Sequence, residues 1–82
     1  MKTYFIGEKE VTNLKNQILD YDNYGNEIYL NDKLALKNGD EAIVYDINYI
    51  GQLLAKGKNG IRYVIDGERV IKINNSIANN RS

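Results

Sequence analysis

The stretch "LALKNGDEAIVYDI", residues 34–47, decides the fold class, because it consists of two β-like runs joined by Asn38 and Gly39. Asn-Gly is the preferred pair for a two-residue type I′ hairpin turn, since both residues accept a positive φ. We therefore expect an antiparallel hairpin in which Lys37 lies opposite Asp40. In this register one set of side chains shares a face: Leu34, Leu36, Glu41, Ile43 and Tyr45.

Three further β-like runs follow this hairpin toward the C-terminus. They are "QLLAK" (52–56), "IRYVI" (61–65) and "ERVIKI" (68–73), and turns at 48–51, 57–60 and 66–67 separate them. No proline interrupts any run. Four or five short strands, with turns at intervals of about ten residues, are typical of a small barrel or sandwich. The predicted fold class is therefore mainly β.

The N-terminal third supports two interpretations. In "EVTNLKNQILDY", residues 10–21, the apolar positions Val11, Leu14, Ile18 and Tyr21 recur at helical intervals. Acidic residues near its start would favour the positive end of a helix dipole. A short amphipathic helix over about residues 10–19 is the prediction. The alternative is a strand at 17–21 that forms a hairpin with residues 27–30.

The composition excludes several classes of site. The 82 residues form one domain, and neither cysteine nor histidine is present, so disulfides and the usual zinc sites are excluded. No apolar run is long enough for a signal peptide or a membrane span, and we expect a cytoplasmic protein without membrane partners. Heavy use of Asn, Ile, Lys and Tyr is typical of AT-rich coding. It indicates a low-GC bacterium, or a phage or other mobile element within one.

The segment "DYDNYGNEIYLND", residues 20–32, begins like a calcium-binding loop. Asp20, Asp22 and Gly25 match positions one, three and six of an EF-hand loop. Tyr24 at position five and Asn31 at position twelve do not supply the oxygens that calcium needs. A turn rich in Asp and Asn is the better interpretation. We predict neither a metal site nor a cofactor.

The same segment resembles the entry to SH3-like barrels, with the pattern D-x-x-G-x-x-I-x-x-(G/N)-D-x-L. The matching residues are Asp22, Gly25, Ile28, Asn31, Asp32 and Leu34. Asn31 stands where glycine is usual, and Asn tolerates a left-handed backbone. From there the chain also resembles the C-terminal domain of biotin protein ligases. The residues that carry this resemblance are Gly39, Ala42, Asp46, Ile47, Gly51, Leu53, Leu54, Gly60, Gly67, Glu68 and Val70.

This resemblance covers about residues 28–73, and Arg69 is an insertion relative to the ligase pattern. It implies a small SH3-like barrel of about five antiparallel strands, and residues 1–27 are then an N-terminal strand or helix extension. A flexible tail (74–82) follows. The ligase catalytic domain has no counterpart here. The resemblance therefore implies an accessory role and not biotin ligation.

Chemistry-bearing side chains are sparse. The serines and Thr3 lie near the termini, and the close acidic pairs, such as Asp20 and Asp22, lie in or beside predicted turns where solvated carboxylates are expected. The turn at 57–60 is too short for a phosphate loop and precedes a strand. We therefore expect no enzymatic activity.

Two binding functions remain, and the first is protein binding. Seven tyrosines are present, and tyrosine gives a large contact area at low entropic cost. The candidates in or beside turns are Tyr21, Tyr24, Tyr29 and Tyr49. We expect the partner to be a host protein or protein complex. The chain would then be an accessory or inhibitor from a phage or mobile element, and anti-defence inhibitors are one such class.

The alternative is nucleic-acid binding, since SH3-like barrels frequently perform it. Net charge is zero, but residues 1–54 hold five lysines against nine acids (−4) and residues 55–82 hold six Lys and Arg against two acids (+4). Zero net charge argues against strong non-specific binding. A basic stripe beside Tyr63 would supply the phosphate contacts, with Lys56, Lys58, Arg62, Arg69 and Lys72.

Overall fold

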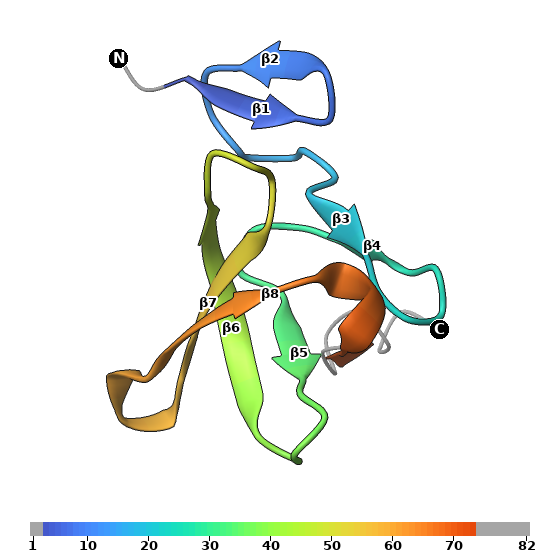
Figure 1. Ribbon diagram of the computed structural model, residues 1–82, viewed down its shortest axis with the longest axis vertical. Coiled ribbons are helices and arrows are strands. Elements are labelled where there is room, and N and C mark those ends of the chain that lie inside the picture. The colour runs from blue at the N-terminus through green and yellow to red at the C-terminus, as the bar shows by residue number, and fades with distance from the viewer. Residues whose placement is uncertain (1–2, 74–82) are drawn as a thin grey trace.

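The computed structural model describes residues 3–73 and folds them into three antiparallel sheets (Figure 1). Strands β1 and β2 form one hairpin, β3 and β4 form a second, and five strands form the main sheet in the order β8-β7-β6-β5-β9. The predicted tail 74–82 lies outside the described residues. The strands are β1 (Tyr4–Ile6), β2 (Lys9–Val11), β3 (Asp20–Tyr21), β4 (Glu27–Ile28), β5 (Lys33–Ala35), β6 (Glu41–Ile47), β7 (Leu53–Gly57), β8 (Arg62–Ile65) and β9 (Ile71–Ile73).

The predicted hairpin of residues 34–47 is present, but its register is shifted by one residue. Leu34 pairs with Ala42, and the Leu36 amide donates to the Asp40 carbonyl over 2.7 Å. Three residues therefore form the loop, and within it Gly39 alone has a positive φ, of 94°. This geometry is a type I turn followed by a left-handed residue, and not the two-residue type I′ turn predicted.

The shifted register reverses which face of β6 is buried. Ala42 and Val44 are buried beside Leu34, whereas Ile43 and Tyr45 are exposed on the other face. The prediction that Ile43 and Tyr45 share a face with Leu34 is therefore wrong. The error arises because side chains in a strand alternate between the two faces, so that a shift of one residue in the pairing exchanges the buried and the exposed sets.

A β-bulge in β6 adjusts this alternation near its C-terminal end. The pairing with β7 shifts between Val44 and Asp46, so that Tyr45 is the extra residue. Unbroken alternation from Val44 would direct Asp46 into the core. The bulge directs Ile47 there instead, where it is buried.

The predicted helix over residues 10–19 is wrong. Within residues 3–73 this segment is strand β2 followed by an irregular loop. The Asn13 side chain accepts the Lys15 amide over 3.0 Å, and Asn16 adopts a left-handed φ of 64°. Such local turns by asparagine compete with helix formation. The alternative hairpin is present, because β3 pairs with β4.

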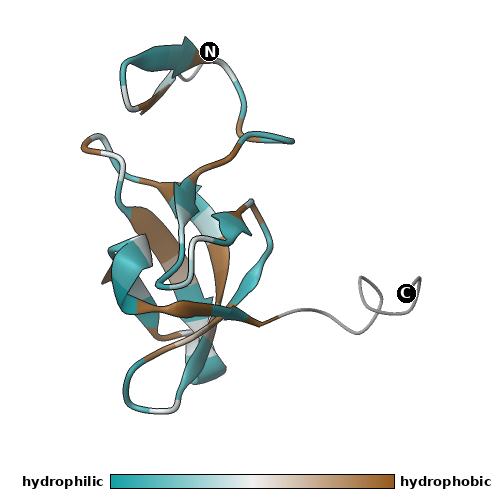
Figure 2. Cartoon of the chain, turned by 90° about the vertical axis from the view of Figure 1, so that its right-hand side faces the viewer, coloured by the Kyte–Doolittle hydropathy of each residue, from teal (hydrophilic) through white to brown (hydrophobic). Residues whose placement is uncertain are grey.

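Two of the four apolar positions with helical spacing, Val11 and Leu14, are buried in the core without a helix, whereas Tyr21 is half exposed. Val11, Leu14 and Leu19 pack in one core with Ile28 of β4 and with side chains of the main sheet, of which Leu34, Val44 and Leu53 are the largest that are fully buried. Figure 2 shows apolar residues along the strands of the main sheet, whereas the β1–β2 hairpin is largely hydrophilic and lies beyond it. The N-terminal third therefore closes one end of the core.

The β3–β4 hairpin is attached to the C-terminal part of the chain through Asp20 and Asp22. Asp20 Oδ2 accepts the Gly67 amide over 3.0 Å, and Asp22 Oδ2 accepts the Lys72 amide over 2.8 Å. Gly67 begins the 3-10 turn η2 (Gly67–Arg69), and a Cβ there would collide with the Tyr21 carbonyl oxygen and the Asp20 carboxyl. Glycine is therefore required for this close approach.

Residues 3–73 include no helix that is long and apolar enough to cross a membrane.

Candidate functional site

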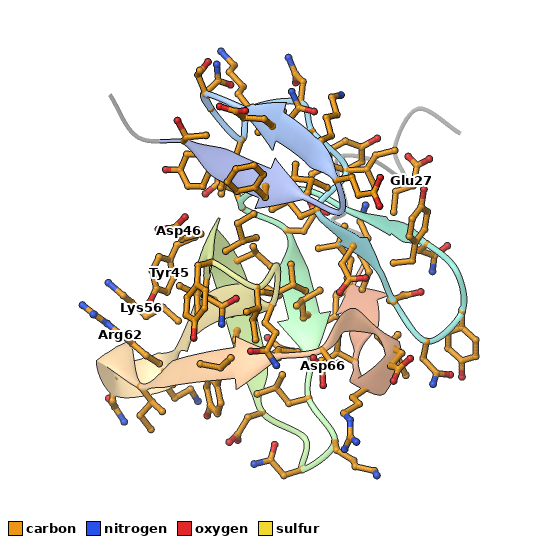
Figure 3. All side chains as sticks on the ribbon, turned by 45° about the horizontal axis from the view of Figure 1, so that its top comes forward. Glu27, Tyr45, Asp46, Lys56, Arg62 and Asp66 are labelled. Atoms are coloured by element: carbon orange, nitrogen blue, oxygen red, sulfur yellow. The ribbon has the colours of Figure 1, made fainter. Side chains whose placement is uncertain are left out.

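The exposed face of β6, β7 and β8 combines an aromatic ring with two cations. Lys56 Nζ and the Arg62 guanidinium each lie 5.9 Å from the centre of the Tyr45 ring. Figure 3 shows the three side chains gathered on one side of the molecule, with Glu27 on the opposite side. Cations at this distance from a tyrosine ring are attracted by its negative face. We call Tyr45, Lys56 and Arg62 the aromatic-basic cluster.

Strand pairing and the bulge bring this cluster together. Lys56 of β7 is the cross-strand partner of Arg62 in β8 and of Ile43 in β6. Tyr45, at the bulge, is on the same face and remains 38% exposed. Bulges are frequent beside functional sites because they redirect a side chain without unfolding the strand.

Apolar side chains on the same face surround the cluster. Val64 is 61% exposed in the edge strand β8, and Ile43 is exposed in β6. Lys33 in β5 forms an ion pair of 3.7 Å with Glu41 at the margin of this face. An exposed pair of this kind contributes little to stability, and each of its two charges only partly offsets the other. The face therefore offers apolar and cationic contacts side by side, with the Asp46 carboxylate next to Tyr45 (Figure 3).

The β7–β8 hairpin concentrates positive charge. Residues 55–65 contain Lys56, Lys58 and Arg62 and no acidic residue. Lys58 lies in the 3-10 turn η1 (Lys58–Gly60) at the tip of this hairpin. The three cations thus extend from the outer face to the tip and form a local anion-attracting surface.

A groove of about 670 Å³ lies between the β5–β6 and β7–β8 hairpin tips, next to the cluster. Lys56 and Ile43 border both the groove and the outer face, and Lys58, Ile61 and Tyr63 are among the other residues that line the groove. The Tyr63 hydroxyl donates to Asp40 Oδ2 over 3.3 Å. Burial, together with the nearby Asp40 carboxylate, raises the pKa of Tyr63, so it stays neutral and able to donate at physiological pH.

The structure divides the basic residues predicted for nucleic-acid binding. It brings together Lys56, Lys58 and Arg62, and Tyr63, beside which they were placed, is half-buried and lines the groove with Lys56 and Lys58. Arg69 lies in η2, where it pairs with Asp66 over 3.8 Å. Lys72 is half-buried in β9: its Nζ donates to the Glu27 carbonyl over 2.8 Å and pairs with Asp32 over 3.1 Å. These contacts hold Lys72 away from the stripe.

Three of the four candidate tyrosines belong to the β3–β4 hairpin or its margin. Tyr24, at the tip, is 72% exposed, and Tyr21 in β3 is half exposed. Tyr29 follows β4, donates its hydroxyl to Glu27 Oε1 over 2.7 Å and lies 5.5 Å from Lys72 Nζ. The hydrogen bond to Glu27, partial burial and the nearby carboxylates raise the pKa of Tyr29. Tyr29 is therefore committed to contacts within the protein.

The fourth candidate, Tyr49, stands apart from the others. It lies in the turn between β6 and β7 and is 91% exposed. The structure thus brings Tyr21, Tyr24 and Tyr29 into one region and leaves Tyr49 in another.

Asp22 in the former calcium-like loop is used for folding. It is only 4% exposed, and its carboxylate accepts hydrogen bonds from the Tyr24, Asn26 and Lys72 amides and from the Asn26 side chain. Burial alone would raise its pKa, but these hydrogen bonds outweigh burial and lower the pKa of Asp22. Within the part of the chain that the structure describes, no three acidic side chains gather into a metal-binding group.

Sequence reasoning missed Tyr45 and Ile43 as surface residues. The cause is the assumed two-residue turn, which placed both on the face of Leu34. The signal that could have identified them is Gly39 as the last residue of a three-residue loop.

No family model, no curated protein and no solved structure matches the chain.

Proposed function

We propose that the chain is a non-enzymatic binding domain with an SH3-like barrel, and that its β6–β8 outer face binds nucleic acid. The strand order β8-β7-β6-β5-β9 supports the barrel assignment, because the last strand returns beside the first of the five. The 3-10 turn η2 connects β8 to this returning strand. As in the resemblance to the ligase domain, the role is accessory, in the cytoplasm of the host.

The aromatic-basic cluster is the observation that carries this function. Nucleic-acid-binding surfaces combine cations for phosphates with aromatic rings for bases, and Lys56 and Arg62 flank Tyr45 in this way. The zero net charge of the chain limits strong non-specific binding. We therefore expect modest affinity that depends on this face.

A direct test is fluorescence anisotropy with labelled oligonucleotides over a range of salt concentrations. Three phosphate contacts, from Lys56, Lys58 and Arg62, predict a slope of log K against log salt of about −2. The double substitution Lys56→Gln with Arg62→Gln should remove most of the binding. Lys15→Gln is the matched control, since this exposed lysine lies in the N-terminal loop. Absence of binding at low salt, or equal loss in the control, would refute the function.

Protein binding is the second candidate, because the β3–β4 hairpin presents Tyr21 and Tyr24 on a rigid support. Asp22 fixes the hairpin to β9, and the Asn23 amide and side chain donate to the Val70 and Glu68 carbonyls over 2.9 Å each. A fixed, exposed tyrosine loses little entropy on binding. The partner would be a host protein or complex that a phage or mobile-element inhibitor, such as an anti-defence protein, blocks.

The test of this second function is capture from host lysate by the intact protein and by a Tyr21→Ala, Tyr24→Ala variant. Salt-resistant capture of one protein that only the intact chain retains would support it. The same capture by both forms would place the contact elsewhere. Tyr49→Ala serves as the control, because Tyr49 is more exposed but lies outside the hairpin.

A further inference from the structure

We propose that the ligand of the β6–β8 face is single-stranded, with one base stacked on Tyr45 and the neighbouring nucleotide in the groove beside it. This inference rests on the proposed nucleic-acid binding and specifies the class of nucleic acid. It is carried by the exposed tyrosine ring and by the groove that continues from it.

Tyr45 distinguishes a single strand from a duplex. In a duplex the base faces are stacked on one another and only edges and phosphates are accessible, so a tyrosine ring finds no base face to contact. In a single strand each base offers a free face, and aromatic side chains stack on it. The bulge holds the Tyr45 ring on the outside of the sheet, within 6 Å of both cations. A base that stacks on this ring would take the place of Lys56 or Arg62 over its face, and the displaced cation would then contact the adjoining phosphate.

The groove provides the next position along β6. Ile43 precedes Tyr45 by two residues on the same face, which corresponds to roughly 7 Å along a strand. Ile43 and its cross-strand partner Lys56 form the boundary between the Tyr45 ring and the groove. A nucleic-acid strand that follows β6 would thus pass from the stacked base over Lys56 into the groove.

The lining of the groove suits one nucleotide. Its volume, about 670 Å³, is within the range of small-molecule sites. Lys33, Lys56 and Lys58 supply cations at its border, and the exposed side chain of Ile61 offers an apolar contact for a base. Asp40 and Glu41 also line it. Asp40 accepts the Tyr63 hydroxyl and Glu41 pairs with Lys33, so both acids are partly compensated.

The experiment compares a labelled oligothymidylate with a duplex of equal length, using the intact chain, four single variants and the double variant Lys56→Gln with Arg62→Gln. We expect the single strand to bind at least about 10-fold more tightly than the duplex. Tyr45→Ala should weaken single-strand binding by about 5- to 100-fold, and Tyr45→Phe, which keeps the ring, should bind like the intact chain. Ile61→Glu should also weaken it, because a carboxylate in the groove repels phosphate. Tyr49→Ala, outside the face, should have no effect.

The outcomes separate this inference from the function on which it rests. Two results would overturn the single-strand inference and leave nucleic-acid binding standing. The first is equal binding of the single strand and the duplex. The second is that Tyr45→Ala binds like the intact chain, whereas Lys56→Gln with Arg62→Gln does not. Competition by an acidic polypeptide as effective as that by the oligonucleotide would also overturn it, because the face would then recognise charge alone. Failure to bind either nucleic acid would refute both.

Discussion

At the scale of single residues, Asp22 is the carboxylate on which the attachment of the β3–β4 hairpin depends. Its two oxygens accept four hydrogen bonds, of which the bond from the Lys72 amide spans fifty residues of sequence. Hydrogen bonds to a charged acceptor are stronger than neutral ones, and a buried donor left without its acceptor is costly. The Asp22 carboxylate, which resembled a calcium ligand in the sequence, thus accepts backbone amides in place of carbonyl oxygens.

Asp22→Asn should lower the free energy of unfolding by about 1–3 kcal/mol, because its amide nitrogen would face N–H donors and leave one of them unpaired. Urea denaturation of both forms measures this difference. Glu10→Gln is the control: Glu10 is exposed in β2, and its substitution should change stability by less than about 0.5 kcal/mol. Equal stability of Asp22→Asn and the parent chain would contradict the role assigned to Asp22.

The lowered pKa of Asp22 also predicts the direction of a pH dependence. A carboxyl whose pKa is lower in the folded than in the unfolded state stabilises the fold above its unfolded pKa of about 3.9. That contribution is lost as the pH falls through the folded pKa. The stability difference between the parent chain and Asp22→Asn should therefore be constant near neutral pH and shrink below about pH 4. A difference that stays unchanged down to pH 2 would contradict this account.

At the scale of elements, three turns share one geometry. In each, the amide of the first residue donates to the carbonyl four residues on, and the glycine just before that acceptor is the one residue of the turn with a positive φ. The turns are Asp22–Asn26, Leu36–Asp40 and Asn48–Gln52. In two of them the side chain of the first residue, Asp22 or Asn48, also accepts backbone amides of the same turn. The repeated use of this loop sets the register of three hairpins.

The sequence predicted where the strands lie better than how they pair. Turn glycines and β-branched runs located β5 to β9, because these signals are local. The register of β5 with β6 depends on whether both Asn38 and Gly39 or only Gly39 adopts a positive φ. A two-residue loop and a three-residue loop are both compatible with this sequence. The helical spacing in residues 10–19 was misleading, since any segment that returns repeatedly to a core can bury residues three or four apart. The aromatic-basic cluster joins three strands, so its recognition required the correct register.

Gly39→Ala tests the three-residue loop. Gly39 has a φ of 94°, and no atom lies within 4 Å of a Cβ built there, so the cost of alanine is backbone strain alone. We expect a loss of about 1–2 kcal/mol in urea denaturation. Gly39→Asn should lose less, because asparagine tolerates the left-handed region better. Gly39→Ala with unchanged stability would contradict the loop geometry.

At the scale of the whole molecule, a net charge of zero conceals two regions of opposite sign. Residues 20–32 hold four acids and no cation, and residues 55–65 hold three cations and no acid. Figure 3 shows Glu27 of the first region on the side opposite Lys56 and Arg62 of the second. Such a separation steers an anionic ligand to one face and repels it from the other. The proposed nucleic-acid face and the tyrosine hairpin are thus electrostatically distinct.

Mapping the ligand onto the surface by NMR tests the central claim most directly. Titration of the isotopically labelled protein with a short oligothymidylate should shift the amide signals of Ile43, Tyr45, Lys56, Lys58, Arg62 and Val64. Those of Tyr21 and Tyr24, in the acidic hairpin, should remain unchanged. Shifts centred on the β3–β4 hairpin, or no shifts at low salt, would contradict the assignment of the β6–β8 face as a nucleic-acid-binding surface.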